Sequence, residues 1–82
     1  NEGTYTTLQV GLKIKFKLKS GLETIGTITK IFSDGVEAKL DKPTYDKNGN
    51  SISTSLVTMD TLMGVMFKDK WYTKEEFFNN FS

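Results

Sequence analysis

Four lysines alternate with apolar residues in the most regular stretch of the sequence, and their spacing suits contacts with phosphate groups. These lysines are Lys13, Lys15, Lys17 and Lys19. Because successive side chains of a strand point to opposite sides, the stretch predicts one apolar face and one lysine face. Ammonium groups roughly 6–7 Å apart along a strand could follow a phosphate backbone and release its counterions.

The same lysines could instead form an ordinary solvated surface that discourages aggregation of strand edges. Glu23, Glu37 and Asp41 could lie close enough to neutralise them. The chain has a formal net charge of only +1, so attraction to nucleic acid must come from clustered lysines. We add Lys30 and Tyr45 to the candidate nucleic-acid-binding residues, the tyrosine because its ring could stack on a base. Further lysines that could extend the cluster are Lys39, Lys42 and Lys47.

Four aromatic residues could contact a base, a methylated cation or a protein surface: Tyr45, Phe67, Trp71 and Tyr72. In small domains, tryptophan and tyrosine more often pack in the core with a polar edge at the surface. We therefore place Phe67 and Trp71 in the core and leave the positions of Tyr45 and Tyr72 open. In the alternative function, protein binding, the candidate site consists of Trp71 and Tyr72.

The composition excludes several kinds of chemistry. The chain has no histidine and no cysteine, which removes the commonest general base, the commonest transition-metal ligand and the thiolate nucleophile. No Gly-Lys-Ser/Thr phosphate loop is present. We predict a non-enzymatic protein with no catalytic residue, no metal site and no cofactor. No apolar run is long enough to span a membrane and no signal-peptide pattern is visible, so we expect a cytoplasmic protein.

The order of turns and apolar runs predicts an all-β fold in one domain of 82 residues. We expect a small, highly bent, five-stranded antiparallel barrel with a short C-terminal capping helix. Ser20-Gly21, Asp34-Gly35 and Asn48-Gly49 provide the turn signals. The predicted segments are a three-stranded meander over 12–40, a hairpin and return strand over 41–63, a short hairpin over 65–72 and a helix over 73–81.

Two local features sharpen this prediction. Thr73 and Glu76 have the spacing of a capping box, in which each side chain accepts a hydrogen bond from the backbone of the other. A helix this short must be held by docking of its phenylalanines, and we expect it to close one end of the barrel. Gly26 interrupts a run of isoleucine and threonine, which indicates a bulge or a sharp bend in the second strand.

Three short motifs resemble the first motif of Sm-like proteins: Leu18-Lys19-Ser20-Gly21, Gly26-Thr27-Ile28 and Asp34-Gly35-Val36. They are also similar to the opening strands of the wider class of small Src-homology-3-like barrels, which includes Tudor and KOW modules. The resemblance covers residues 12–40, about a third of the chain. The second Sm motif, with its Arg-Gly pair, is absent. Membership of the wider class implies a binding module, since its members mostly bind RNA, DNA or proteins and few are enzymes.

These observations leave three candidate functions open. The first is binding of RNA or DNA through the lysine-lined strand. The second is binding of a single host protein by a small adaptor or inhibitor, such as phages encode against host machinery. The third is a Tudor-like reader of methylated lysine, which needs several aromatic side chains and a carboxylate around one cage. The sequence specifies no oligomeric state.

Overall fold

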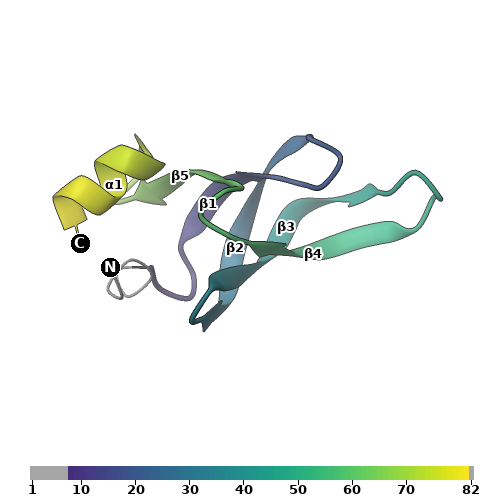
Figure 1. The fold of residues 1–82 in the computed structure, drawn as a ribbon, viewed down its shortest axis with the longest axis horizontal. Helices are drawn as coiled ribbons and strands as arrows, with labels where there is room; N and C mark the ends of the chain where they lie inside the picture. Colours follow the sequence, from purple (N-terminus) through teal and green to yellow (C-terminus); the bar gives the residue numbers. More distant parts are fainter. Residues whose placement is uncertain (1–7, 82) are drawn as a thin grey trace.

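The computed structural model describes residues 8–81 and consists mostly of antiparallel β-sheet with one short C-terminal helix (Figure 1). The strand order across the sheet is β4-β3-β2-β1-β5-β6. The elements are β1 (Lys13–Lys17), β2 (Glu23–Phe32), β3 (Gly35–Tyr45), β4 (Ser51–Val57), β5 (Leu62–Phe67), β6 (Lys70–Thr73) and α1 (Lys74–Phe81). The long β3–β4 hairpin extends at one end of the molecule, and α1 lies at the other end (Figure 1).

The prediction of a closed five-stranded barrel is wrong in two respects. The sheet has six strands, because the last hairpin contributes both β5 and β6. Within the described residues the sheet is also open, since β4 and β6 lie at its two edges and do not pair with each other. β1 lies inside the sheet, where it pairs with β2 on one side and β5 on the other.

The β5–β6 hairpin forms around a turn that carries no glycine. Lys68 and Asp69 both have positive φ angles, 52° and 65°. Two consecutive left-handed residues are typical of the type I′ turn, whose twist matches that of the flanking strands. This turn places Tyr72 opposite Val65 and Trp71 opposite Met66, which decides the face of the sheet on which each aromatic side chain lies.

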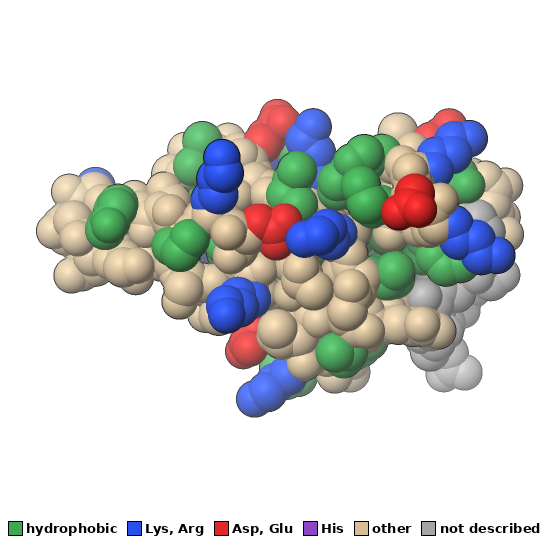
Figure 2. All heavy atoms as spheres, turned by 180° about the vertical axis from the view of Figure 1, so that it is seen from behind, with side chains coloured by type: hydrophobic (Ala, Val, Ile, Leu, Met, Phe, Trp, Pro, Cys, Tyr) green, Lys and Arg blue, Asp and Glu red, His purple; other side chains and the backbone are tan. Residues whose placement is uncertain are grey.

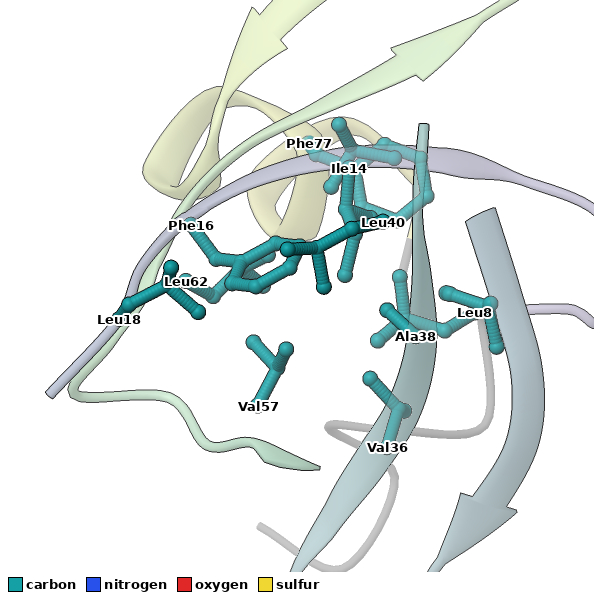
Figure 3. Close-up of a cluster of buried hydrophobic side chains, with 12 residues drawn as sticks. Leu8, Ile14, Phe16, Leu18, Val36, Ala38, Leu40, Val57, Leu62 and Phe77 are labelled. Atoms are coloured by element: carbon teal, nitrogen blue, oxygen red, sulfur yellow. The ribbon is translucent and has the colours of Figure 1, made fainter. Parts of the chain in front are cut away.

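The core lies against one face of the sheet and is filled from several elements (Figure 3). Ile14 and Phe16 of β1 are fully buried, while the lysines between them are exposed. Phe77 of α1 joins this cluster and is only 2% exposed. All buried side chains among the described residues are apolar, so burial of apolar surface is the main stabilising term.

The capping box at the start of α1 is confirmed. The backbone N–H of Glu76 donates to Thr73 Oγ1 at 3.1 Å, and the backbone N–H of Thr73 donates to Glu76 Oε1 at 3.0 Å. Both carboxylates of the first turn, Glu75 and Glu76, lie near the positive end of the helix dipole. The cap and the burial of Phe77 together fix this short helix against β5 and β6.

Gly26 lies in a regular part of β2, which corrects the prediction of a bulge at this residue. The register shift between β2 and β3 falls between Ile28 and Lys30 instead. A Cβ atom at Gly26 would lie 2.7 Å from the carbonyl oxygen of Lys39 and 3.1 Å from the ring of Phe16. Glycine is therefore required here by the close approach of the neighbouring strand and the core ring.

Candidate nucleic-acid interface

Three of the four predicted lysines project from β1 on one side of the sheet. Lys13, Lys15 and Lys17 are exposed, and the residues between them are buried. Partner side chains on adjacent strands point to the same side as the residue they pair with. We call this surface the lysine face and define it by Lys13, Lys15, Lys17 and their cross-strand partners.

Carboxylates approach the lysine face from the β2 and β3 side. Lys13 Nζ lies 2.7 Å from Asp41 Oδ2, and Lys15 Nζ lies 3.9 Å from Glu23 Oε1. Glu23 is also the register partner of Lys17. The members of both ion pairs are substantially exposed, so each pair contributes at most about 1 kcal/mol to stability. Positive, negative and apolar side chains are intermingled on the molecular face in Figure 2.

The β5 side of the lysine face has a different character. The β5 partners of Lys13 and Lys15 are Met66 and Gly64, neither of which carries a charge. Gly64 also lacks a side chain, which leaves a depression beside Lys15. The lysines therefore have carboxylate neighbours on the β2 and β3 side and uncharged register partners on β5, while Glu76 of α1 also lines the depression beside Lys15.

Lys19 is exposed but lies outside the strand, because β1 ends at Lys17. The chain turns there: the N–H of Gly21 donates to the carbonyl of Leu18 at 2.9 Å, and Gly21 has a φ of 89°. Lys19 lies within this turn. The predicted Ser20-Gly21 turn is confirmed, but the prediction of four lysines on one strand face is wrong because the turn begins one residue after Lys17.

A hollow of about 640 Å³ lies between this turn and the tip of the β3–β4 hairpin, and we call it the hairpin hollow. It brings together two of the predicted binding residues, Lys19 and Tyr45, and adds Lys47. Its apolar lining includes Leu18, Leu22 and Ile52. The Tyr45 side chain is 71% exposed, so this ring, whose position the sequence left open, is accessible to a ligand.

Asp46 also lines the hairpin hollow, where it stabilises the hairpin tip. Its carboxylate accepts hydrogen bonds from the backbone N–H groups of Asn50 and Asn48, each at 2.9 Å. The bond from Asn50, followed by that from Asn48, holds the pKa of Asp46 below its ordinary value of 3.8. Lys19 and Lys47 with Asp46 leave the lining with one net positive charge.

Lys30 lies apart from both surfaces. The pairing of β2 with β1 ends at Thr27, and Lys30 follows the register shift beyond it. Its partner on β3 is Glu37. The structure thus brings Lys13, Lys15 and Lys17 together, brings Lys19 to Tyr45, and places Lys30 with neither group.

Trp71 and Tyr72 occupy opposite sides of β6. Tyr72 is half-buried and packs against the core, with Lys70 Nζ 5.1 Å from its ring centroid. Trp71 is 40% exposed, so its predicted place in the core is wrong. Phe67 is half-buried and meets Phe77 edge to face, with ring centroids 6.1 Å apart, which agrees with its predicted packing role.

Among the described residues, no helix is both long and apolar enough to cross a membrane. That part of the chain also holds no cluster of three or more histidine, cysteine or acidic residues able to bind a metal.

Comparisons with known proteins identify no relative: no protein-family model, no curated protein and no solved structure matches the chain.

Proposed function

We propose that this chain is a non-enzymatic nucleic-acid-binding module whose contact surface is the lysine face. The observation that carries the proposal is the projection of Lys13, Lys15 and Lys17 from one side of a strand held between two others. Paired strands fix the spacing of these lysines before a ligand arrives, so little backbone order is lost on binding. The resemblance of residues 12–40 to small barrels that bind RNA, DNA or proteins supports the same class of function.

The charge distribution suggests a path for the phosphate backbone. Asp41 and Glu23 flank the lysines on the β2 and β3 side, where they would repel phosphate. Met66 and Gly64 flank them on the β5 side without charge. A phosphate backbone would therefore run along β1 on its β5 side. The hairpin hollow, where Lys19 and Tyr45 lie together, is a separate candidate contact on the β3–β4 side of the sheet.

Fluorescence anisotropy with short labelled RNA and DNA tests this proposal. If three phosphates are contacted, affinity should fall about 20- to 40-fold between 50 and 200 mM salt, since each contributes about −0.7 to −0.9 to the slope of log K against log salt. The triple variant K13E/K15E/K17E should lose binding and remain folded. Unchanged binding by this variant would overturn the proposal.

A matched control separates local from overall charge. Each lysine-to-glutamate change replaces one positive charge by one negative charge. Three changes therefore lower the formal net charge from +1 to −5. The variant K42E/K68E/K70E has the same net charge as the test variant but keeps all three β1 lysines. It should retain most of the affinity. Equal losses in the two triple variants would show that net charge, and not the lysine face, governs binding.

A second candidate function, binding of a single protein, is favoured by the open sheet. The strands β4 and β6 lie at its edges, and an exposed edge can accept an extended peptide as an additional strand. The 40% exposure of Trp71 beside the β6 edge supports the same function. A pull-down from nuclease-treated lysate should then retain one protein with the wild-type chain and lose it with Trp71→Ala. Recovery of no protein from the nuclease-treated lysate would contradict this candidate.

A further inference from the structure

Trp71 lies on the lysine face, two strands away from Lys13. Lys13 pairs with Met66 on β5, and Met66 pairs with Trp71 on β6. Because paired residues of antiparallel strands point to the same side, the indole and the ammonium group of Lys13 share one surface. Neighbouring strands lie about 4.8 Å apart, so the two backbone positions are separated by about 10 Å.

The surface between β1 and Trp71 is hollowed because Gly64 of β5 has no side chain. Gly64 is the β5 partner of Lys15 and the partner of Thr73 on β6. A Cβ atom at this glycine would lie 2.9 Å from the carbonyl oxygen of Tyr72 and 3.9 Å from Trp71 Cε3. The result is a depression of about 380 Å³, whose lining includes Lys15, Gly64 and the indole.

The chemistry of this depression suits an aromatic ligand with a negative charge at one end. The exposed side chains of Ile25 and Trp71 provide apolar contact area, and Lys15 provides a cation on the β1 side. Glu76 of α1 also lines the depression, and its Oε1 accepts the backbone N–H of Thr73 at 3.0 Å, so its negative charge disfavours an anionic group near α1. A planar ring would therefore lie toward Trp71, with its negative group toward Lys15.

We infer that Trp71 is a stacking platform for one unpaired base, and that the ligand of the lysine face is therefore a single-stranded nucleic acid. This inference rests on the proposed function. Stacking on an aromatic side chain requires a base whose face is free, whereas the bases of a duplex are stacked on one another. The phosphate next to the stacked base would be bound by Lys15, which lines the same depression as Trp71.

The chain provides its own probe, since Trp71 is its single tryptophan. Titration with single-stranded oligothymidylate or oligouridylate should quench the indole fluorescence at the same concentrations that change the anisotropy of the labelled strand. Trp71→Ala should weaken binding roughly 5- to 150-fold, the range that corresponds to loss of stacking on one base. Trp71→Phe keeps an aromatic ring and should retain most of the affinity. Both variants should keep the wild-type salt slope, because no phosphate contact is removed.

The outcomes separate this inference from the proposed function. If Trp71→Ala binds as tightly as the wild type, and the wild-type indole fluorescence is not quenched, the inference is overturned while nucleic-acid binding stands. If a duplex of the same sequence binds as tightly as the single strand, the assignment of a single-stranded ligand is overturned. If the wild type binds neither form at low salt, the proposed function fails and the inference with it. Loss of affinity in Trp71→Ala with a native circular dichroism spectrum, and rescue by Trp71→Phe, would support the platform.

Discussion

Replacing Gly26 with alanine tests the packing beneath the lysine face. The new Cβ atom would lie 2.7 Å from the backbone oxygen of Lys39 and 3.1 Å from the ring of Phe16. Side-chain rotation cannot relieve the first contact, because the opposing atom belongs to the backbone of β3. To reach an ordinary separation of about 3.4 Å, β2 and β3 would have to move apart by about 0.7 Å, which weakens their hydrogen bonds.

The expected cost follows from two opposing terms. Overpacking of a well-filled site costs about 1–3 kcal/mol, and a contact against backbone belongs near the upper end of this range. Alanine also restricts the unfolded chain more than glycine does, which offsets about 0.4–1 kcal/mol. We therefore expect Gly26→Ala to lower the free energy of unfolding by about 2 kcal/mol. For a domain of this size such a loss lowers the melting temperature by about 8–16 °C.

Urea denaturation followed by circular dichroism measures this change. With a slope of about 1–2 kcal/mol per molar urea, the midpoint should fall by about 1–2 M. Gly49→Asn is the matched control: Gly49 has a φ of 84° and no atom within 4 Å of a built Cβ, and asparagine tolerates this conformation. The control should cost less than Gly26→Ala, because it introduces some backbone strain but no close contact. A Gly26→Ala variant as stable as the control would refute the close β2–β3 approach.

Three further predictions concern charges and caps. Asp41→Asn should tighten nucleic-acid binding about threefold at low salt. A phosphate bound at Lys13 would lie about 5–6 Å from the Asp41 carboxylate, and two such charges repel by about 0.7 kcal/mol in water. Weaker binding of this variant, measured by fluorescence anisotropy, would contradict the proposed path. Asp46 should titrate below 3.8 by NMR, since the N–H of Asn50 stabilises its charged form. Its contribution to stability is then present above pH 3.8 and is lost as the pH falls through the lower pKa of the folded state; a carboxyl that titrates above 3.8 would refute this. Thr73→Ala should cost about 1 kcal/mol and Thr73→Ser much less, and equal losses in urea denaturation would argue against the hydroxyl as the cap.

Features that depend on neighbouring residues were predictable from the sequence. The alternation of Ile14 and Phe16 with lysines correctly predicted the buried and exposed sides of β1. The spacing of Thr73 and Glu76 predicted the capping box, and both of its hydrogen bonds are present. In each case the physical cause acts within one strand or one helical turn, so a short stretch of sequence contains the information.

Features that depend on the pairing of distant strands were not predictable in the same way. Pro43 has no backbone N–H to donate, yet β3 continues through it to Tyr45. The pairing of β3 with β4 shifts between Lys39 and Thr44, and a residue without an N–H is tolerated at such an irregularity. Because β3 continues past Pro43, Tyr45 lies near the tip of the β3–β4 hairpin, where it lines the hairpin hollow together with Lys19. No local pattern in the sequence connects these two residues, which are brought together only by the length of the hairpin.

The position of Trp71 depends on the register of one short turn. The sequence predicts a hairpin over 65–72, but Lys68 and Asp69 adopt left-handed angles without glycine, so no local pattern indicates the two residues at which the chain reverses. A shift of one residue in this turn would exchange the two sides of β6, because side chains alternate along a strand. Trp71 would then point to the core and Tyr72 to the lysine face. The observed register places β6 beyond β5 and puts the indole of Trp71 on the same side of the sheet as the β1 lysines. The same short turn thus determines the presence of an aromatic side chain on the proposed binding surface.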